Sequence, residues 1–288
     1  MDGRRWLLVG ASGLVGSHLR TALQGRDVTL TSYRTPIVGS IPLDLTDRAA
    51  IARVSRDVRP DVILLAAADA FVELCEREPE ATRKVNVDPI RSLTAAVGDG
   101  TLVVFSSEYV FDGLAGDYAE DDDVAPINEY GRQKVEIEAL ARAVPRHLIL
   151  RLSGVYGWSA ARTSFVAQLV DRLRSGRRFT VPSDQLITPT PAQDLAPAIV
   201  DLIEHGASGT FHAAGPEIVA RADFAIRAAK AFGLDASLLD ALPTAQLGLA
   251  APRPTRAGLR TEKLRAFLGR SLASADSALA AMREREPR

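Results

Sequence analysis

Three polar side chains near the middle of this 288-residue chain could together transfer a proton: the hydroxyl of Ser107, the phenol of Tyr130 and the ammonium of Lys134. Tyr130 and Lys134 are four residues apart, so on a helix they share one face. A free phenol, with a pKa of about 10, is a poor acid–base at neutral pH. A cation held beside it favours the phenolate and lowers that pKa, as a general acid–base requires. We therefore expect this set to be catalytic, although a Tyr–Lys pair can also arise by chance on a surface helix.

The strand that would carry Ser107 is the apolar run 101–105, which predicts a buried parallel strand. Ser107 lies just beyond its end. Doubly wound folds bind ligands at the carboxyl ends of their parallel strands. The position of Ser107 therefore fits an active site at that edge of a sheet.

A glycine-rich turn near the N-terminus predicts a dinucleotide site. The short apolar strand 6–9 is followed by Gly10, Gly13 and Gly16, and 17–23 has the pattern of a helix. These glycines would allow a tight turn, close approach to a pyrophosphate and helix–strand packing, while the helix N-terminus offers amide donors. A purely structural glycine turn is the alternative. We expect cofactor contacts from Gly10, Ser12, Gly13, Leu14, Val15 and Gly16.

The end of the second strand, 27–32, bears on the choice of cofactor. An Asp or Glu that would bind an NAD ribose is absent there, and Arg34 follows. Arg34 could pair with a 2′-phosphate, which favours NADPH and leaves NADH possible, or it could equally be a solvated loop charge.

Further cofactor contacts are predicted along the chain. Asp44, followed by Leu45, could bind an adenine amine, and the small side chains of Ala66, Ala67 and Ala68 would let a cofactor lie against the backbone. Asn86 lies inside a predicted helix, where its amide could tie down a neighbouring strand or loop, or simply make a polar core contact.

The alternation of strands and helices with short connections predicts an α/β fold: a Rossmann-type doubly wound parallel sheet with a smaller C-terminal α/β substrate lobe. We expect the sheet domain to span 1–153 and the lobe mainly 154–288, with segments near 177–212 returning to the sheet domain. Expected strands are 6–9, 27–32, 62–65, 101–105, 147–152, 179–181 and 210–212, and expected helices are 17–23, 46–58, 72–78, 81–97, 129–143, 164–174, 192–204, 221–232 and 260–288.

Composition excludes several other classes of protein. A formal net charge of −1 and 25% charged residues give no reason to expect a nucleic-acid or membrane partner. The single cysteine, Cys75, excludes an internal disulfide and fits a reducing cytoplasm, and the N-terminus lacks a signal segment. The four histidines show no ligand spacing, so we predict no metal.

Several motifs together resemble one family, the extended short-chain dehydrogenases/reductases, and within it the dTDP-4-dehydrorhamnose reductase-like branch. The resemblance spans nearly the whole chain. It rests on Gly10/Gly13/Gly16, Arg59–Val62, Val85-Asn86-Val87, Ser106–Gly113, Tyr130–Lys134, Leu150–Gly157, Asp184–Thr190, Gly209–Gly215 and Arg253-Pro254.

The resemblance implies an NADPH-dependent reduction of a 4-keto sugar carried on a nucleotide. Tyr130 would give a proton to the keto oxygen, Ser107 would hydrogen-bond that oxygen, and Lys134 would hold the nicotinamide ribose. It also implies substrate contacts from Glu108, Tyr109 and Arg253, and a possible homodimer.

Three departures from the family pattern leave the substrate open. Gly154 stands where relatives carry Trp, Glu108 where they usually carry Asp, and the segment 158–165 lacks their usual polar residues. A deoxy- or aminosugar of another shape, or a non-sugar ketone, therefore fits as well. Two further alternatives are an epimerase or dehydratase of the same superfamily, and a regulatory subunit like the β subunit of methionine adenosyltransferase.

Overall fold

The computed structural model describes residues 3–161 and 163–287. A seven-stranded, all-parallel sheet forms its centre, with strand order β11-β6-β5-β4-β1-β2-β3. Its strands are β1 (Arg5–Val9), β2 (Asp27–Ser32), β3 (Ile41–Pro42), β4 (Val62–Leu65), β5 (Thr101–Ser107), β6 (His147–Leu152) and β11 (Gly209–His212). The predicted doubly wound fold is confirmed.

Side chains alternate between the two faces of the sheet, and helices cover both. In β1, Trp6 and Leu8 pack on one face, whereas Leu7 and Val9 pack on the other. The first face is covered by α1 (Leu14–Ala22), α8 (Ala192–Glu204) and α10 (Glu262–Leu268). The second is covered by α2 (Arg48–Val58), α5 (Asp88–Val97) and α6 (Glu129–Ala141), with α3 (Val72–Arg77) and α4 (Pro79–Asn86) beside α6.

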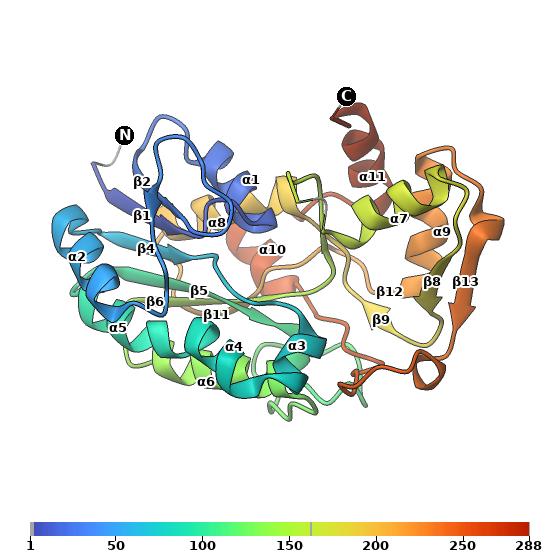
Figure 1. Cartoon of the computed structure of the whole chain (residues 1–288), viewed down its shortest axis with the longest axis horizontal. Helices are drawn as coiled ribbons and strands as arrows, with labels where there is room; N and C mark the ends of the chain where they lie inside the picture. The colour runs from blue at the N-terminus through green and yellow to red at the C-terminus, as the bar shows by residue number, and fades with distance from the viewer. Residues whose placement is uncertain (1–2, 162, 288) are drawn as a thin grey trace.

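A smaller lobe packs around its own core, with Tyr156, Phe224 and Leu279 fully buried in it. Figure 1 shows this lobe on the right and the large sheet on the left. Its helices are α7 (Phe165–Arg174), α9 (Arg221–Ala231) and α11 (Ala275–Glu284). Three two-stranded sheets join β7 (Val155–Tyr156) to β10 (Thr190–Pro191), β9 (Leu186–Ile187) to β12 (Val219–Ala220), and β8 (Phe179–Pro182) to β13 (Leu239–Leu242).

Two expected helices are each two helices in the structure. The segment 81–97 divides into α4 and α5 around Val87, because Pro89 lacks a backbone N–H and restricts the residue before it. The C-terminal segment divides into α10 and α11 after Gly269, which has a left-handed φ of 67°.

The segment 177–212 belongs to both parts of the molecule. Its later half, α8 and β11, packs with the large sheet. β8 does not return to that sheet, because it pairs with β13 in the lobe. α10, which follows much later in the chain, also packs on the large sheet. The expected boundary at 153/154 therefore separates the first sheet strands from the lobe, but later segments cross back.

No helix in the described ranges is long and apolar enough to span a membrane. Within the same ranges, no group of three or more His, Cys, Asp or Glu side chains is arranged to hold a metal ion.

Candidate active site

The predicted catalytic residues lie where β5 ends and α6 begins. α6 starts after Asn128, whose side-chain oxygen accepts a hydrogen bond from the backbone N–H of Gly131 at 2.8 Å. A Cβ on Gly131 would lie 2.1 Å from the carbonyl oxygen of Tyr109, so only glycine lets the helix come this close. This approach brings Tyr130 next to Ser107 at the end of β5.

Ser107, Tyr130 and Lys134 are brought together. Ser107 lies close enough to the phenol of Tyr130 for its hydroxyl to help lower the Tyr130 pKa, and it accepts a hydrogen bond from the backbone N–H of Tyr109 at 3.2 Å. The ammonium of Lys134 lies 5.4 Å from the centroid of the Tyr130 ring and donates to the carbonyl oxygen of Phe105 at 2.8 Å. Lys134 is therefore attached to β5 as well as to its own helix.

The pKa of Tyr130 departs from the sequence-based expectation. Burial raises the pKa of this phenol well above its ordinary value, and Ser107 only partly opposes that rise. The expectation of a lowered Tyr130 pKa is wrong, because desolvation of the phenolate dominates. Burial also lowers the pKa of Lys134, to about 8. Tyr130 is consequently protonated, as a proton donor must be.

A buried ion pair holds α6 against the sheet. Arg151 of β6 donates to Glu138 of α6 at 2.9 Å, with both side chains at most 3% exposed. The hydroxyl of Ser106 donates to the same carboxylate at 2.6 Å. Because one partner alone would be an uncompensated buried charge, this contact fixes the helix that carries Tyr130 and Lys134.

A groove of about 200 Å³ runs along the carboxyl ends of β1, β2 and β4. Most of the predicted cofactor residues line it: Gly10, Ser12, Gly13, Arg34, Asp44, Leu45, Ala66, Ala67 and Ala68. A wider cavity, of about 950 Å³, opens at the opposite, amino ends of the strands among residues such as Arg59 and Thr101. We place the cofactor in the smaller groove because it lies at the end of the sheet that carries Ser107.

The three glycines of the first turn differ in what they touch. Gly10 has a φ of 89°, and a Cβ on it would lie 2.6 Å from the backbone nitrogen of Ala67. A Cβ on Gly16 would lie 2.1 Å from the carbonyl oxygen of Gly10, whereas one on Gly13 would meet nothing closer than 3.7 Å. Gly13 thus has no internal need to be glycine, which fits a backbone kept bare for a ligand.

The remaining two turn residues, Leu14 and Val15, open α1 and do not line the groove. Gly13 caps this helix without any side-chain hydrogen bond, so its first turn is free of a competing side-chain cap. Such an arrangement suits the diphosphate of a dinucleotide.

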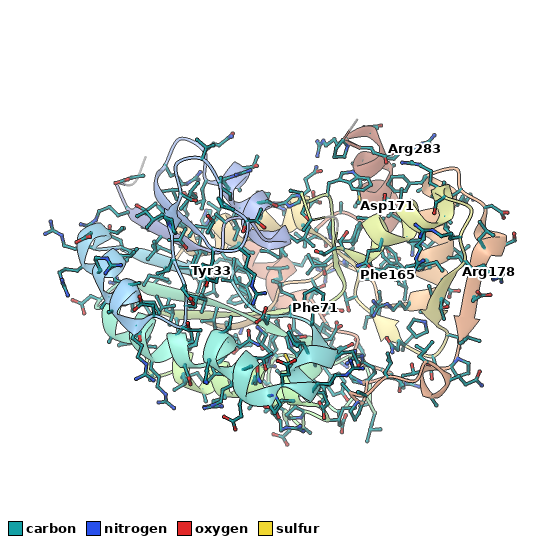
Figure 2. The ribbon with its side chains drawn as sticks, in the orientation of Figure 1. Tyr33, Phe71, Phe165, Asp171, Arg178 and Arg283 are labelled. Carbon is teal, nitrogen blue, oxygen red and sulfur yellow. The ribbon has the colours of Figure 1, made fainter. Side chains whose placement is uncertain are left out.

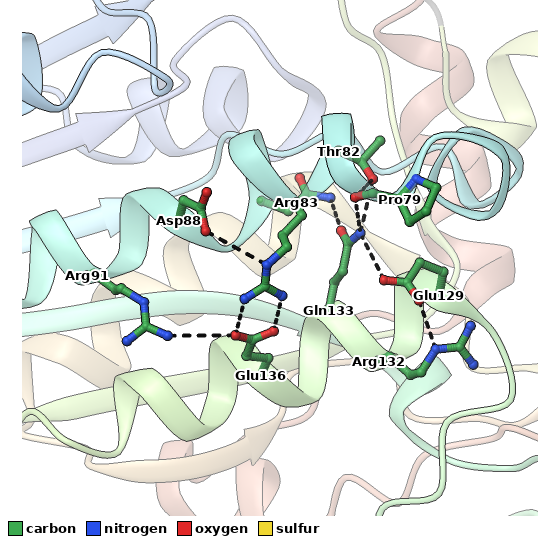
Figure 3. A network of polar contacts seen from close by, with 10 residues as sticks. Pro79, Thr82, Arg83, Asp88, Arg91, Glu129, Arg132, Gln133 and Glu136 are labelled. Atoms are coloured by element: carbon green, nitrogen blue, oxygen red, sulfur yellow. Dashed lines mark hydrogen bonds and ion pairs between the residues drawn. The ribbon is translucent and has the colours of Figure 1, made fainter.

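Asn86 lies behind the groove and does not line it. Its side-chain oxygen accepts from the backbone N–H of Asp69 at 2.8 Å, and its amide nitrogen donates to the Asp69 carbonyl at 3.1 Å. The same nitrogen donates to Gln133 of α6 at 2.9 Å, and Gln133 in turn donates to Thr82 at 3.0 Å. Figure 3 shows Gln133 between Thr82 and Glu129, beside the Arg83–Glu136 ion pair. Asn86 therefore ties the loop after β4 to the catalytic helix.

The predicted substrate residues line the other side of Tyr130. Tyr109 packs edge-on against Tyr130, with 5.9 Å between ring centroids, and the Arg253 guanidinium lies 5.9 Å from the Tyr109 ring. Glu108 is 7% exposed, and one of its carboxylate oxygens has no hydrogen-bond partner. Burial raises the pKa of Glu108 to about 8, opposed by the charge of Arg221. Glu108 is thus largely protonated at neutral pH.

Comparison with known proteins places this site in a family. A family model described as the RmlD substrate binding domain matches residues 4–286. The chain belongs to the RmlD substrate-binding domain family. It is an NAD(P)-dependent oxidoreductase of the short-chain dehydrogenase/reductase superfamily, which confirms the resemblance seen in its motifs.

The proteins similar to this RmlD-family chain include reductases and a subunit of methionine adenosyltransferase. A probable low-salt glycan biosynthesis reductase of Haloferax volcanii is 33% identical over 287 residues, covering 96% of both chains. The methionine adenosyltransferase 2 subunit beta of Danio rerio is 29% identical, covering 94% of this chain and 87% of its own. Among solved structures, the dTDP-4-dehydrorhamnose reductase of Bacillus anthracis in complex with NADP has a TM-score of 0.87 at 26% identity, covering 97% and 98%.

One residue of this RmlD-family site was missed by sequence reasoning. Arg221, the first residue of α9, comes from the lobe, and its buried Nε has no hydrogen-bond partner. Its guanidinium stacks 4.8 Å from the ring of Phe165, which is labelled in the lobe in Figure 2. Nη1 of Arg253 is likewise buried without a hydrogen-bond partner, while Nη2 of the same side chain donates to Glu73 at 2.8 Å. No local pattern marks Arg221, because only folding brings it near Glu108.

The departures from the family pattern occupy defined positions. Gly154 has a left-handed φ of 50°, and a Cβ there would lie 3.3 Å from Ile187. Trp158 packs against the core of the lobe, where its indole N–H donates to the carbonyl oxygen of Met282 at 2.7 Å. Arg162, within the unusual 158–165 segment, lies outside the described residues.

Proposed function

We propose that this protein uses NADPH to reduce the keto group of a nucleotide-linked sugar, most closely a 4-keto deoxysugar of the dTDP-4-dehydrorhamnose type. The observation that carries the proposal is the clustering of Ser107, Tyr130 and Lys134 at the carboxyl edge of the sheet, with the Lys134 ammonium 5.4 Å from the Tyr130 ring and a Tyr130 pKa raised by desolvation. A phenol in that state can give a proton to an oxygen that gains negative charge.

Tyr130, Ser107 and Lys134 would each have a separate role in this reduction. Tyr130 donates the proton to the former keto oxygen, and Ser107 hydrogen-bonds that oxygen as its charge develops. Lys134, charged below a pKa of about 8, is placed by the Phe105 carbonyl to hold the ribose beside Tyr130 and to stabilise the phenolate left after proton transfer. The nicotinamide supplies the hydride when it is bound.

The cofactor assignment rests on the groove. Gly10 and Gly13 expose their backbone to the groove, and the small side chains of Ala66 to Ala68 leave room for a cofactor on its opposite side. The end of β2 offers Thr31 and Ser32 instead of an acid, with Arg34 just beyond. The NADP complex of the similar Bacillus anthracis reductase supports NADPH, and NADH remains the second cofactor to test.

The substrate class rests on three side chains that each have one buried polar atom without a hydrogen-bond partner: Nε of Arg221, Nη1 of Arg253 and Oε2 of Glu108. Arg221 and Arg253 offer buried N–H donors, and the protonated Glu108 offers a hydrogen bond beside Tyr130. Two guanidinium groups suit an anionic diphosphate, and a neutral carboxyl suits a sugar hydroxyl. A ketone without charge would leave the guanidinium donors unsatisfied.

Net turnover tests the proposal. Purified protein is incubated with NADPH or NADH and a panel of dTDP-, UDP- and GDP-linked 4-keto sugars, and cofactor oxidation is compared with product formed. One cofactor oxidised per product supports a reductase. Product without oxidation indicates an epimerase or dehydratase.

A regulatory role is the second candidate, because a methionine adenosyltransferase β subunit is 29% identical over most of the chain. A pull-down that yields a stoichiometric protein partner, together with cofactor binding but no turnover on any sugar, would favour it. Turnover by the purified protein alone would exclude a purely regulatory role.

We also predict a cytoplasmic homodimer without nucleic-acid or membrane partners. The near-neutral net charge argues against a nucleic-acid partner and the free, buried Cys75 fits the cytoplasm, whereas the homodimer rests on the superfamily resemblance. Light scattering after size-exclusion chromatography measures the oligomeric state directly, and a monomer at every concentration tested would contradict it.

A further inference from the structure

The loops after β2 and β4 are joined by an ion pair across the predicted cofactor groove. Nη1 of Arg34 donates to Oδ1 of Asp69 at 3.0 Å, and both residues line the groove. The Arg34 side chain is 72% exposed, whereas that of Asp69 is only 10% exposed. The guanidinium that is proposed to meet a 2′-phosphate is therefore already bound to a carboxylate of the same chain.

The two partners differ in their freedom to move. Asn86 holds both the backbone N–H and the backbone carbonyl of Asp69, and the thiol of Cys75 donates to that carbonyl at 3.5 Å. Arg34 has no comparable restraint: it stands on an exposed loop, and Asp69 is its hydrogen-bond partner. If the pair separates, Arg34 moves and Asp69 stays.

A second carboxylate faces the same guanidinium. Asp44 lies close enough to Arg34 for that charge to help lower the Asp44 pKa, although hydrogen bonds from Thr46 contribute most of the lowering. Thr46 donates to Asp44 through its backbone N–H and its hydroxyl, both at 2.8 Å, and the Tyr33 hydroxyl also bonds to it. Because Asp44 is satisfied by these neighbours, Asp69 is the carboxylate that competes for Arg34.

We propose that Asp69 tunes the coenzyme preference of this protein by competing with the 2′-phosphate of NADPH for Arg34. This inference rests on the proposed function, since it assumes that a nicotinamide dinucleotide occupies the groove. The 2′-phosphate of NADPH must compete with Asp69 for the charge and the N–H donors of Arg34, whereas NADH carries no phosphate at that position. Asp69 thus reduces the advantage that Arg34 gives to NADPH.

The test compares dissociation constants of NADPH and NADH for the full-length protein, measured by calorimetry. Asp69→Asn keeps the size of the side chain and removes its charge. It should tighten NADPH binding about three- to fivefold, the usual range for a partly exposed ion pair, and leave NADH binding unchanged. Arg34→Gln should weaken NADPH binding and abolish the effect of Asp69→Asn in the double variant.

A matched control is Asp201→Asn, which removes the acid from another exposed pair, Arg270–Asp201 at 2.6 Å. It should change neither constant. Equal tightening or weakening of both coenzymes by Asp69→Asn would overturn the competition, because the pair would then act on the shared part of the dinucleotide. An unchanged NADPH constant would also overturn it. Failure of the wild-type protein to bind either coenzyme would instead refute the proposed function.

Discussion

The two sides of the catalytic cleft are built in different ways. The cofactor side is made of short continuous segments at the ends of β1, β2 and β4, and most of its predicted residues line one groove. The substrate side combines the end of β5 with Arg221 from the lobe and Arg253 from a late loop. A groove made of strand ends can be predicted from local patterns, whereas a surface made of distant segments cannot.

The largest expected effect concerns Tyr130, which lies between the cofactor side and the substrate side. Tyr130→Phe removes the proton donor but keeps the ring that packs against Tyr109. We expect turnover to fall roughly 10²-fold or more, the usual scale of lost acid–base catalysis, with NADPH affinity nearly unchanged. Steady-state kinetics and calorimetry measure the two quantities. Unchanged turnover would remove Tyr130 from its assigned role.

The substrate side is tested by Arg221→Gln. Loss of a charged donor to the substrate should raise KM roughly 10- to 100-fold and leave the NADPH dissociation constant unchanged. Arg178→Gln, on the same lobe but paired with Asp240, is the matched control and should leave KM unchanged. Equal effects of the two variants would show that the lobe matters only for stability.

The cofactor side is tested by Gly13→Ala. The protein itself has room for this methyl group, so the melting temperature should change little. Affinity for both coenzymes should fall roughly tenfold, because the methyl group occupies the approach of the pyrophosphate. Gly16→Ala offers a contrast, since its Cβ would overlap the Gly10 carbonyl and should reduce stability directly. Full coenzyme affinity in Gly13→Ala would contradict the assigned groove.

The smallest expected effect is a pH dependence on the substrate side. The folded-state pKa of Glu108 is raised to about 8, so the folded protein binds more protons than the unfolded chain between about pH 4.5 and 8. Wild-type stability should therefore fall over that range relative to Glu108→Gln, by at least about 1 kcal/mol, since one pKa unit corresponds to about 1.4 kcal/mol. Urea denaturation at pH 5 and pH 8 measures this difference. A difference that grows in the opposite direction would mean that Glu108 is ionised in the folded protein.

The pattern of residues was sufficient to predict most of the fold and most of the residues that line the groove. Apolar runs marked the strands, and the alternation with helices required parallel pairing, because each crossover returns the chain in the same direction. The spacing of Tyr130 and Lys134 placed both on one helix, and the glycines marked the turn before α1. The break at Val87, two residues before Pro89, was missed because the apolar spacing continues across it.

The tertiary structure decided the properties that depend on burial and on distant partners. The pKa of Tyr130 rises because folding removes water from around it. The spacing of Tyr130 and Lys134 in the sequence could not predict this desolvation. Arg34 is paired with Asp69 because two separate loops meet over the groove, and Arg221 reaches Glu108 only through the lobe. The sequence alone determined which chemical groups the strand ends carry. Desolvation and long-range packing, which appear only on folding, determined their protonation states and partners.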